Sequence, residues 1–306
     1  MDRLDAMSVV VAVGEGGSLS AAARRLGVPL PTVSRRVSDL ETHLNTRLFN
    51  RSTRRLTLTD AGQAYLHACK RILEDVTEAE RAASGEFNAP RGDLVISAPI
   101  VFGRLHVLPT IMAFLKVHPD VRIRFVQGDR LINLLEEHVD LAIRIGNLAD
   151  SSLVATRCGS TRRVVCGSPG YFREFGTPKH PTDLGAHALI SFEGLSSPGT
   201  WVFKAEPAEI AVPIRPKLTV NTAEAAIDAA IEGVGLTRVL SYQIERAVKA
   251  GALVRTLRRF EPAPAPISLV YPSQRRLPVK VRAFLDFAAP RLRTRLVSRN
   301  LTSSKT

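Results

Sequence analysis

Residues 18–60 constrain the fold more than any other stretch, because two short helical patterns meet there at a glycine. Apolar side chains recur at helical spacing on both sides of it: Ala22, Ala23 and Leu26 before, and Val33, Val37 and Leu40 after. Small alanines allow two helices to approach closely, and Gly27 can take the positive φ that a tight turn often needs. The spacing from Ala23 to Gly27 to Val33 is typical of a helix-turn-helix, whose second helix enters the major groove of DNA.

The next segment predicts a wing beside these helices. The run Leu56-Thr57-Leu58-Thr59 alternates as in a short strand. Before it lies a basic tip, in which Arg51, Arg54 and Arg55 surround Ser52 and Thr53. A strand, a basic tip and a second strand together make a wing. The local excess of arginine over residues 24–55 supports binding to DNA better than the net charge of +13 does.

Five motifs of this region resemble those of the LysR-type transcriptional regulators: Ala22-Ala23-Arg24-Arg25-Leu26, Val33-Ser34-Arg35-Arg36-Val37, Leu40-Glu41, Arg47-Leu48-Phe49 and Leu58-Thr59-x-x-Gly62. Together they are specific, whereas a lone helix-turn-helix pattern is shared by many helical hairpins. The resemblance runs from about Leu4 to Ala289. It implies an α/β protein with an N-terminal winged helix-turn-helix and a two-lobed, periplasmic-binding-protein-like (type 2) effector domain. It also implies sequence-specific DNA binding and transcriptional regulation, modulated by a small molecule held between two α/β lobes.

The resemblance implies DNA contacts one position at a time: Leu30, Pro31, Thr32, Ser34, Arg35 and Arg36 in the second helix, and Arg51, Arg54 and Arg55 in the wing. Arginine can bridge O6 and N7 of guanine, and a hydroxyl can reach a base or a phosphate. Arg54 falls where the family's wing enters the minor groove, where arginine reads groove width. The alternative is a solvated charged face, which explains any single arginine well but the whole set poorly.

The chain departs from the family at Pro29 and Leu30, where many members carry Ser or Thr and then Gln. The polar helix cap and the side chain that could hold adenine bidentately are both lost. Leu30 can instead contact a thymine methyl group.

A long helix is predicted from Thr59 or Asp60 onward, with Gln63 placed to close a capping box from Asp60. Its apolar residues step by four and three, close to a heptad seam: Ala61, Tyr65, Ala68, Ile72, Val76, Ala79 and Ala83. This stripe can pair with a second copy or pack on its own domain. The charged outer faces favour pairing, in a homodimer or homotetramer whose recognition helices read two half-sites.

The chain is expected to divide into a winged helix-turn-helix at 1–59, a linker and dimerisation helix at 60–88, an effector-binding domain at 89–300 and a basic tail at 291–306. Strands at 93–98, 121–126 and 139–145 alternate with helices at 104–116 and 131–137, which predicts a parallel sheet. Lobe 1 is expected at about 91–160 and 267–290, ending in a helix at 279–289, and lobe 2 at about 161–266. The arginine-rich tail is expected to be a solvated or disordered end.

Ligands of α/β sheets bind beyond the carboxyl ends of strands. The strand ends supply Ala98, Pro99, Ile100, Val101, Gln127, Gly128, Ile145, Gly146, Asn221 and Thr222 as candidate effector contacts, and the resemblance adds Thr200 and Trp201. Each of these can also be no more than a strand end, and Trp201 suits a core as well as a cleft. Helix N-termini near 100–104 and 222 suit a carboxylate. Ala98-Pro99 stand where many relatives carry hydroxyls, which suggests a less polar effector.

Other classes of protein find little support. No Gly-rich phosphate loop follows a strand and no nucleophile elbow appears, so an enzyme is not expected, nor is a cofactor or a metal. Without a signal peptide or an apolar run of membrane-spanning length, we expect a cytoplasmic protein with no membrane contact rather than a transport receptor. A structural chromatin-like protein would lack the two lobes.

The three cysteines, Cys69, Cys158 and Cys166, are expected to be reduced and partly buried, and a redox pair of Cys158 with Cys166 is the lesser alternative. The expected partners are double-stranded DNA, a small-molecule effector, a second copy of the chain and, for an activator, RNA polymerase.

Overall fold

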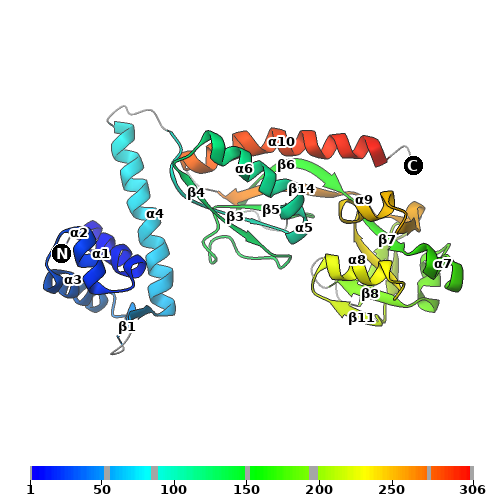
Figure 1. Cartoon of the computed structure of the whole chain (residues 1–306), viewed down its shortest axis with the longest axis horizontal. Helices are drawn as coiled ribbons and strands as arrows, with labels where there is room; N and C mark the ends of the chain where they lie inside the picture. Colours follow the sequence, from blue (N-terminus) through cyan, green and yellow to red (C-terminus); the bar gives the residue numbers. More distant parts are fainter. Residues whose placement is uncertain are drawn as a thin grey trace. The chain divides into compact units, whose positions relative to one another are not determined.

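Figure 1 presents the computed structural model of the chain, in which residues 2–51, 56–83, 89–148, 152–192, 199–273 and 277–303 are described. The chain forms two compact units, Met1–Ala89 and Pro90–Thr306. The first unit contains α1 (Arg3–Gly16), α2 (Leu19–Leu26), α3 (Leu30–His43), β1 (Phe49–Arg51), β2 (Leu56–Leu58) and α4 (Asp60–Ala83).

The helix-turn-helix is confirmed in α2 and α3. Ser18 caps α2, since its Oγ accepts a hydrogen bond from the backbone N–H of Ala21 at 3.1 Å. Gly27 ends α2 with φ of 66°, in the left-handed region expected for the turn. The predicted apolar faces pack together with α1: Ala22, Val33 and Val37 are almost fully buried. Pro29 precedes α3 and provides no side-chain cap, as its chemistry requires.

A carboxylate joins α3 to the first strand of the wing. Glu41 Oε1 accepts hydrogen bonds from the backbone N–H groups of Leu48 and Phe49, at 2.7 and 3.0 Å. β1 then pairs antiparallel with β2, with Phe49 opposite Leu58 and Arg51 opposite Leu56. The predicted strand at Leu56–Leu58 is therefore confirmed, while the basic tip at 52–55 lies outside the described residues.

Thr59 and Gly62 fix the start of α4. The Thr59 hydroxyl donates to the carbonyl of Arg47 at 2.8 Å and accepts from the N–H of Gly62 at 2.9 Å. Thr59 is thus the cap of α4, one of the two residues proposed. The capping box from Asp60 does not form, because the Gln63 side chain pairs with His67 Nε2 at 2.9 Å.

Most of the stripe predicted on α4 lies beside the face that α4 packs within its own unit, although Tyr65 of the stripe packs against the core of that unit. Leu66 and Cys69 are buried there, 5% and 0% exposed, and Leu66 joins the core of the helical bundle. In the predicted stripe, Ile72 is 38% exposed, Ala61 and Ala79 are exposed, and Tyr65, Ala68 and Val76 are partly buried. An apolar stripe therefore stays on the outside of α4 within one copy of the chain.

The second unit contains two five-stranded sheets. The first has the order β4-β3-β5-β14-β6, with β3 (Gly92–Ala98) parallel to β4 (Val121–Gln127) and β5 (Leu141–Ile145). The return strand β14 (Ala265–Pro272) is antiparallel to β5 and to β6 (Leu153–Thr161). The predicted parallel βαβ pattern and the return of the chain near residue 267 are confirmed.

The second sheet has the order β11-β8-β12-β7-β13, and its strands are β7 (Arg163–Gly167), β8 (Leu189–Phe192), β11 (Leu218–Val220), β12 (Leu236–Leu240) and β13 (Val254–Thr256). The helices of this lobe are α7 (Pro169–Phe175), α8 (Ala223–Ile231) and α9 (Ser241–Lys249), with short 3₁₀ turns at Pro181–Ala186 and Arg258–Phe260. A separate hairpin of β9 (Thr200–Phe203) and β10 (Ile210–Pro213) is antiparallel. Figure 1 shows the two sheets as separate lobes, joined where β6 runs into β7 and where the chain returns into β14.

The helix predicted at 131–137 is wrong. Residues 128–140, all described, contain turns but no helix, and His138 has φ of 52°. The apolar residues there do not form a buried stripe, since Leu131 is 80% exposed and Leu135 is 51% exposed, while Leu134 is buried.

The prediction of a solvated or disordered tail is also wrong for residues 291–296, while the side chains of 297–306 lie outside the described residues. The last helix, α10, runs from Val279 to Ser303, and Leu292 and Leu296 are only 1% and 6% exposed. Arg293 Nε donates to the carbonyl of Arg157, and Arg295 Nη1 to that of His106. Residues 291–296 therefore pack on lobe 1, and two of their arginines donate hydrogen bonds to backbone carbonyls.

One helical stretch, Ile100–Val117, is long and apolar enough to cross a membrane by composition alone, so the expectation that no apolar run reaches that length is wrong. It consists of α5 (Ile100–Phe102), a π-helical turn η1 (Gly103–Val107) and α6 (Leu108–Val117). Phe102, Ile111 and Phe114 pack from this stretch into the core of the second unit. Packing in the core of the second unit is therefore enough to explain why this stretch is apolar.

Candidate DNA-binding face and effector pocket

The predicted contacts of α3 lie on the side away from its buried residues. Leu30 is 44% exposed, and Pro31 and Arg35 are also exposed, while Val33 and Val37 are buried. Thr32, Ser34 and Arg36 are partly buried at the edges of this face. Hydroxyl and guanidinium groups therefore share one accessible side of a helix, as major-groove reading requires.

Some charged side chains of the first unit form ion pairs with one another. Arg36 pairs with Asp5 of α1 at 3.2 Å, so a DNA contact by Arg36 competes with a contact inside the protein. Glu15 pairs with Arg25 at 2.6 Å and with Lys70 at 2.7 Å. Burial tends to raise the pKa of Glu15, but these two cations outweigh it and lower the pKa. Glu15 thereby links α1 to both α2 and α4.

The wing contacts remain predictions. Arg51 is the last residue of β1, but its side chain lies outside the described residues, as do Arg54 and Arg55.

Four of the predicted effector residues are buried: Ala98, Pro99, Val101 and Trp201. Ala98 is 1% exposed and belongs to the core of the second unit. Trp201 is 2% exposed in the core of lobe 2, where the Arg238 guanidinium lies 5.2 Å from its ring centroid. The tryptophan is thus the core residue that its size allowed, and it does not line a cleft.

The other candidates lie at or beside the ends of strands and helices, and their contacts with an effector remain predictions. Pro99 is buried ahead of α5, Gln127 ends β4, and Gly128 donates its N–H to the carbonyl of Ala98. Ile145 ends β5, and Gly146 donates to the carbonyl of Pro266. Thr200 begins β9, Asn221 is exposed, and Thr222 caps α8 by accepting from Ala225 N–H.

The two helix N-termini proposed for a carboxylate are already served by side chains of the protein. Asp129 Oδ1 accepts from the N–H of Ile100 at 3.1 Å, at the start of α5. Thr222 Oγ1 does the same for α8 at 3.3 Å. A ligand carboxylate that bound to either of these two N–H groups would have to displace an existing acceptor.

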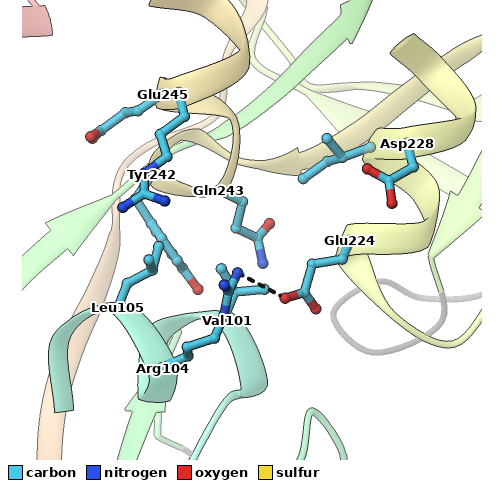
Figure 2. A pocket seen from close by; sticks show the side chains of 10 residues that line it. Val101, Arg104, Leu105, Glu224, Asp228, Tyr242, Gln243 and Glu245 are labelled. Atoms are coloured by element: carbon cyan, nitrogen blue, oxygen red, sulfur yellow. Dashed lines mark hydrogen bonds and ion pairs between the residues drawn. The ribbon is translucent and has the colours of Figure 1, made fainter. Parts of the chain in front are cut away.

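A pocket of about 100 Å³ lies where α5 and η1 of lobe 1 meet α8 and α9 of lobe 2 (Figure 2). Its lining residues come from those four elements: Val101, Arg104, Leu105, Glu224, Ile227, Asp228, Tyr242, Gln243, Glu245 and Arg246. The Arg104 guanidinium pairs with the Glu224 carboxylate at 3.0 Å and so joins the lobes at the pocket. Val101 is the predicted effector residue that lines it.

Tyr242 is the most constrained residue of this pocket. Its ring packs edge-on against Phe102 and His106, with centroids 5.5 and 5.9 Å apart. The side chain is 5% exposed, and its hydroxyl makes no hydrogen bond. Burial raises the pKa of Tyr242, and the nearby charge of Asp129 raises it further, so the phenol is neutral at all ordinary pH values.

Comparison with known proteins identifies the family. Residues 4–63 match the family described as bacterial regulatory helix-turn-helix protein, lysR family, and residues 87–293 match the LysR substrate binding domain. The chain is a LysR-type transcriptional regulator. As such it is a DNA-binding regulator of transcription with an effector-binding domain, and regulators of this family form oligomers.

Relatives of this regulator resemble it over nearly its whole length. An HTH-type transcriptional repressor of Pseudomonas aeruginosa is 35% identical over 289 residues, which cover 94% of this chain and 91% of that protein. An uncharacterized HTH-type transcriptional regulator of Haemophilus influenzae is 34% identical over 281 residues, covering 92% and 98%. The full-length structure of the Vibrio cholerae virulence activator AphB superposes with a TM-score of 0.60 at 28% identity, covering 93% of this chain and 98% of that one.

Sequence reasoning missed most of the pocket of this LysR-type regulator. The strand-end rule reaches Thr222 but stops short of Glu224, and it does not reach α9 at all. One available signal was the polar run Ser241-Tyr242-Gln243, which follows the buried strand β12 and opens α9, and which continues the same strand-end logic.

Proposed function

We propose that the exposed face of α3 reads base edges of the operator, with Arg35 as its main specific contact. The observation that carries this is the exposure of Arg35 on the side of α3 opposite Val33 and Val37. Thr32 and Ser34 flank it and would contact bases or phosphates. Leu30, exposed at the start of the helix, would contact a thymine methyl group, and Arg36 would have to leave Asp5 to reach DNA.

Gel-shift titration of the upstream region of the regulator's own gene tests the role of Arg35. Arg35→Ala should weaken specific binding by roughly 10- to 100-fold, the value of one bidentate guanine contact, with a smaller effect on unrelated DNA. Arg173→Ala, an exposed arginine of α7 in the second unit, is the matched control and should leave both affinities unchanged. Equal losses on specific and unrelated DNA would make Arg35 a phosphate contact and refute the assignment.

We also propose that α4 pairs two copies of the chain through its outer stripe. Ile72 is 38% exposed at the middle of that stripe, while Leu66 and Cys69 occupy the inward face. Ile72→Asp should shift sedimentation of the full chain to a smaller species, because a buried charge opposes a coiled-coil seam. Arg71→Asp adds the same carboxylate beside the stripe and should leave the oligomer intact. Equal effects of the two substitutions would place the pairing surface elsewhere.

The effector is proposed to act from between the lobes, where Arg104 and Glu224 already join them. A ligand that favours one relation of the lobes would shift the population of DNA-bound arrangements and so change transcription. The relatives include one repressor and one activator, so the sign of control is open, and an activator would also contact RNA polymerase. We propose a cytoplasmic, non-enzymatic role, because control of transcription takes place at chromosomal DNA. A DNase footprint upstream of the gene should change when effector is added, and a footprint insensitive to every cell extract fraction would contradict effector control.

A further inference from the structure

We propose that the pocket between α5–η1 and α8–α9 binds a short organic amine, whose ammonium group donates hydrogen bonds to Asp129 and Tyr242. This inference rests on the proposed function, since it names the chemical class of effector for the space between the lobes. It replaces the carboxylate that the helix N-termini suggested from the sequence.

Two buried oxygen atoms lack hydrogen-bond partners, one beside the start of α5, whose Val101 lines the pocket, and one in the pocket lining itself. They are Asp129 Oδ2 and the hydroxyl oxygen of Tyr242. A buried polar atom without a partner costs about 1–3 kcal/mol, so proteins rarely keep one without a use. Ring contacts with Phe102 and His106 hold Tyr242 in position, and the bond from Ile100 N–H to Oδ1 holds Asp129. No hydrogen bond joins the two groups.

The missing partner is a donor. A carboxylate oxygen accepts hydrogen bonds only, and a phenol oxygen can accept one while its proton points elsewhere. An ammonium group carries several N–H donors on one atom and can serve both oxygens at once. Bonds from a charged donor to a carboxylate are also the stronger kind, which offsets the cost of bringing the ligand out of water.

The electrostatics of the pocket favour a cation. Three carboxylates line it, Glu224, Asp228 and Glu245, against Arg104 and Arg246. Asp129 lies outside this lining, and burial and the charge of Glu224 raise its pKa against the lowering effect of the bond from Ile100 N–H, so its charged form is disfavoured where it stands. A bound ammonium would relieve the repulsion between the carboxylates, whereas an anion would increase it.

The shape limits the rest of the ligand to a short apolar chain. Val101, Leu105 and Ile227 supply aliphatic surface beside the polar groups. The volume of about 100 Å³ corresponds to a few groups of water size, each occupying about 30 Å³ in the liquid. In Figure 2 the amide of Gln243 points into the space between Tyr242 and Glu224, where it can contact a polar end of the ligand. The amide is oriented because its Oε1 accepts from the N–H of Leu240 at 2.7 Å.

Calorimetric titration of the full-length regulator with n-butylammonium chloride tests the proposal, with 1-butanol and sodium butyrate as probes of equal chain length. The amine should bind, and the alcohol and the carboxylate should bind at least tenfold more weakly or not at all. Butyrate binding as tightly as the amine, or no binding of the amine, would overturn the proposal.

Two variants assign the site. Asp129→Asn keeps an oxygen for Ile100 N–H but removes the charge, and it should weaken amine binding by roughly 10- to 100-fold. Tyr242→Phe removes a hydroxyl that makes no hydrogen bond, so it should leave the melting temperature unchanged or higher while weakening amine binding several-fold. Glu174→Gln, an exposed carboxylate of α7, is the control and should bind the amine as the wild type does. Wild-type affinity in Asp129→Asn would overturn the assignment.

The outcome can be separated from that of the proposed function. Gel shifts of the upstream DNA with and without the amine report coupling, and Arg35→Ala reports DNA reading. Amine binding lost in Asp129→Asn supports the amine site even if no operator is bound. An operator that is bound and read by Arg35, together with no amine binding, refutes the amine site and leaves the regulator function standing.

Discussion

Replacing Gly62 by alanine tests whether the family's Leu58-Thr59-x-x-Gly62 motif is structural. A Cβ at this position would lie 1.9 Å from the carbonyl oxygen of Leu48 and 2.8 Å from its carbonyl carbon. Ordinary contacts begin near 3.4 Å, so the first turn of α4 and the residue before β1 would have to separate. The neighbour is backbone and cannot rotate away.

Opposing effects decide the size of the change. Alanine in a helix gains up to about 1 kcal/mol over glycine from backbone entropy. Separation would break the bond from Thr59 N–H to Leu48 O, at 3.0 Å, and would disturb the Thr59 cap, which is worth about 1 kcal/mol. The overpacking itself costs about 1–3 kcal/mol or more. The loss therefore outweighs the gain, and we expect a net destabilisation of about 2 kcal/mol or more.

Hydrogen exchange of the full chain, read by mass spectrometry, measures the destabilisation of the first unit separately from the second. Protection of the α1 and α3 amides should fall by roughly 30-fold or more in Gly62→Ala, the equivalent of about 2 kcal/mol. Peptides of the second unit should be unchanged. Gly185→Ala is the matched control, because a Cβ there meets open space. Unchanged or increased protection in Gly62→Ala would refute the reasoning from close approach.

Three further predictions use the same chain. Glu41→Ala should lower protection around Leu48 by the equivalent of about 1.5–3 kcal/mol, since the N–H groups of Leu48 and Phe49, at the start of β1, lose a charged acceptor; full protection would contradict this role of Glu41. Cys166, whose pKa burial raises to about 12, should resist iodoacetamide at pH 8 until the protein unfolds, and rapid labelling of the native protein, seen in peptide masses, would revive the redox alternative. The pKa of Glu15 is lower in the folded protein than its ordinary value of 4.5. Its ion pairs therefore stabilise the folded state at pH values above 4.5, and this stabilisation is lost as the pH falls through the lowered pKa. Glu15→Gln should therefore cost less than about 1 kcal/mol near pH 7 in urea titrations, and nothing at low pH; a constant difference would exclude linkage.

The helix-turn-helix could be predicted because its determinants are local. Steps of three and four residues place Val33 and Val37 on one face, and a serine cap and a glycine turn follow from single residues. The structural roles of Glu41 and Gly62 could not be predicted from local spacing. Glu41 acts seven and eight residues along the chain, and Gly62 is required by the carbonyl of Leu48.

The effector pocket was largely missed because it depends on contacts between distant segments. Arg104 and Glu224 are 120 residues apart and meet only when two lobes have formed. The strand-end rule selects positions along the chain but does not decide which side chains turn inward, so it selected Ala98 although that side chain is buried. Trp201, which the family resemblance added, is buried as well. The tail was misjudged for a related reason: its arginines indicated solvent, whereas Leu292 and Leu296 supply the buried stripe.

Asp129 explains why the carboxylate expectation and the structure disagree. A helix N-terminus attracts an anion because its first N–H groups lack partners inside the helix. At α5 the protein fills this position itself, since Asp129 Oδ1 accepts from Ile100 N–H while Oδ2 remains buried and without a partner. One donor at the start of α5 is therefore already occupied, and the second oxygen of the same carboxylate is an acceptor that needs a donor. An oxygen of this kind selects ligands by their ability to donate, and a carboxylate effector that bound Ile100 N–H would first have to displace the Asp129 side chain.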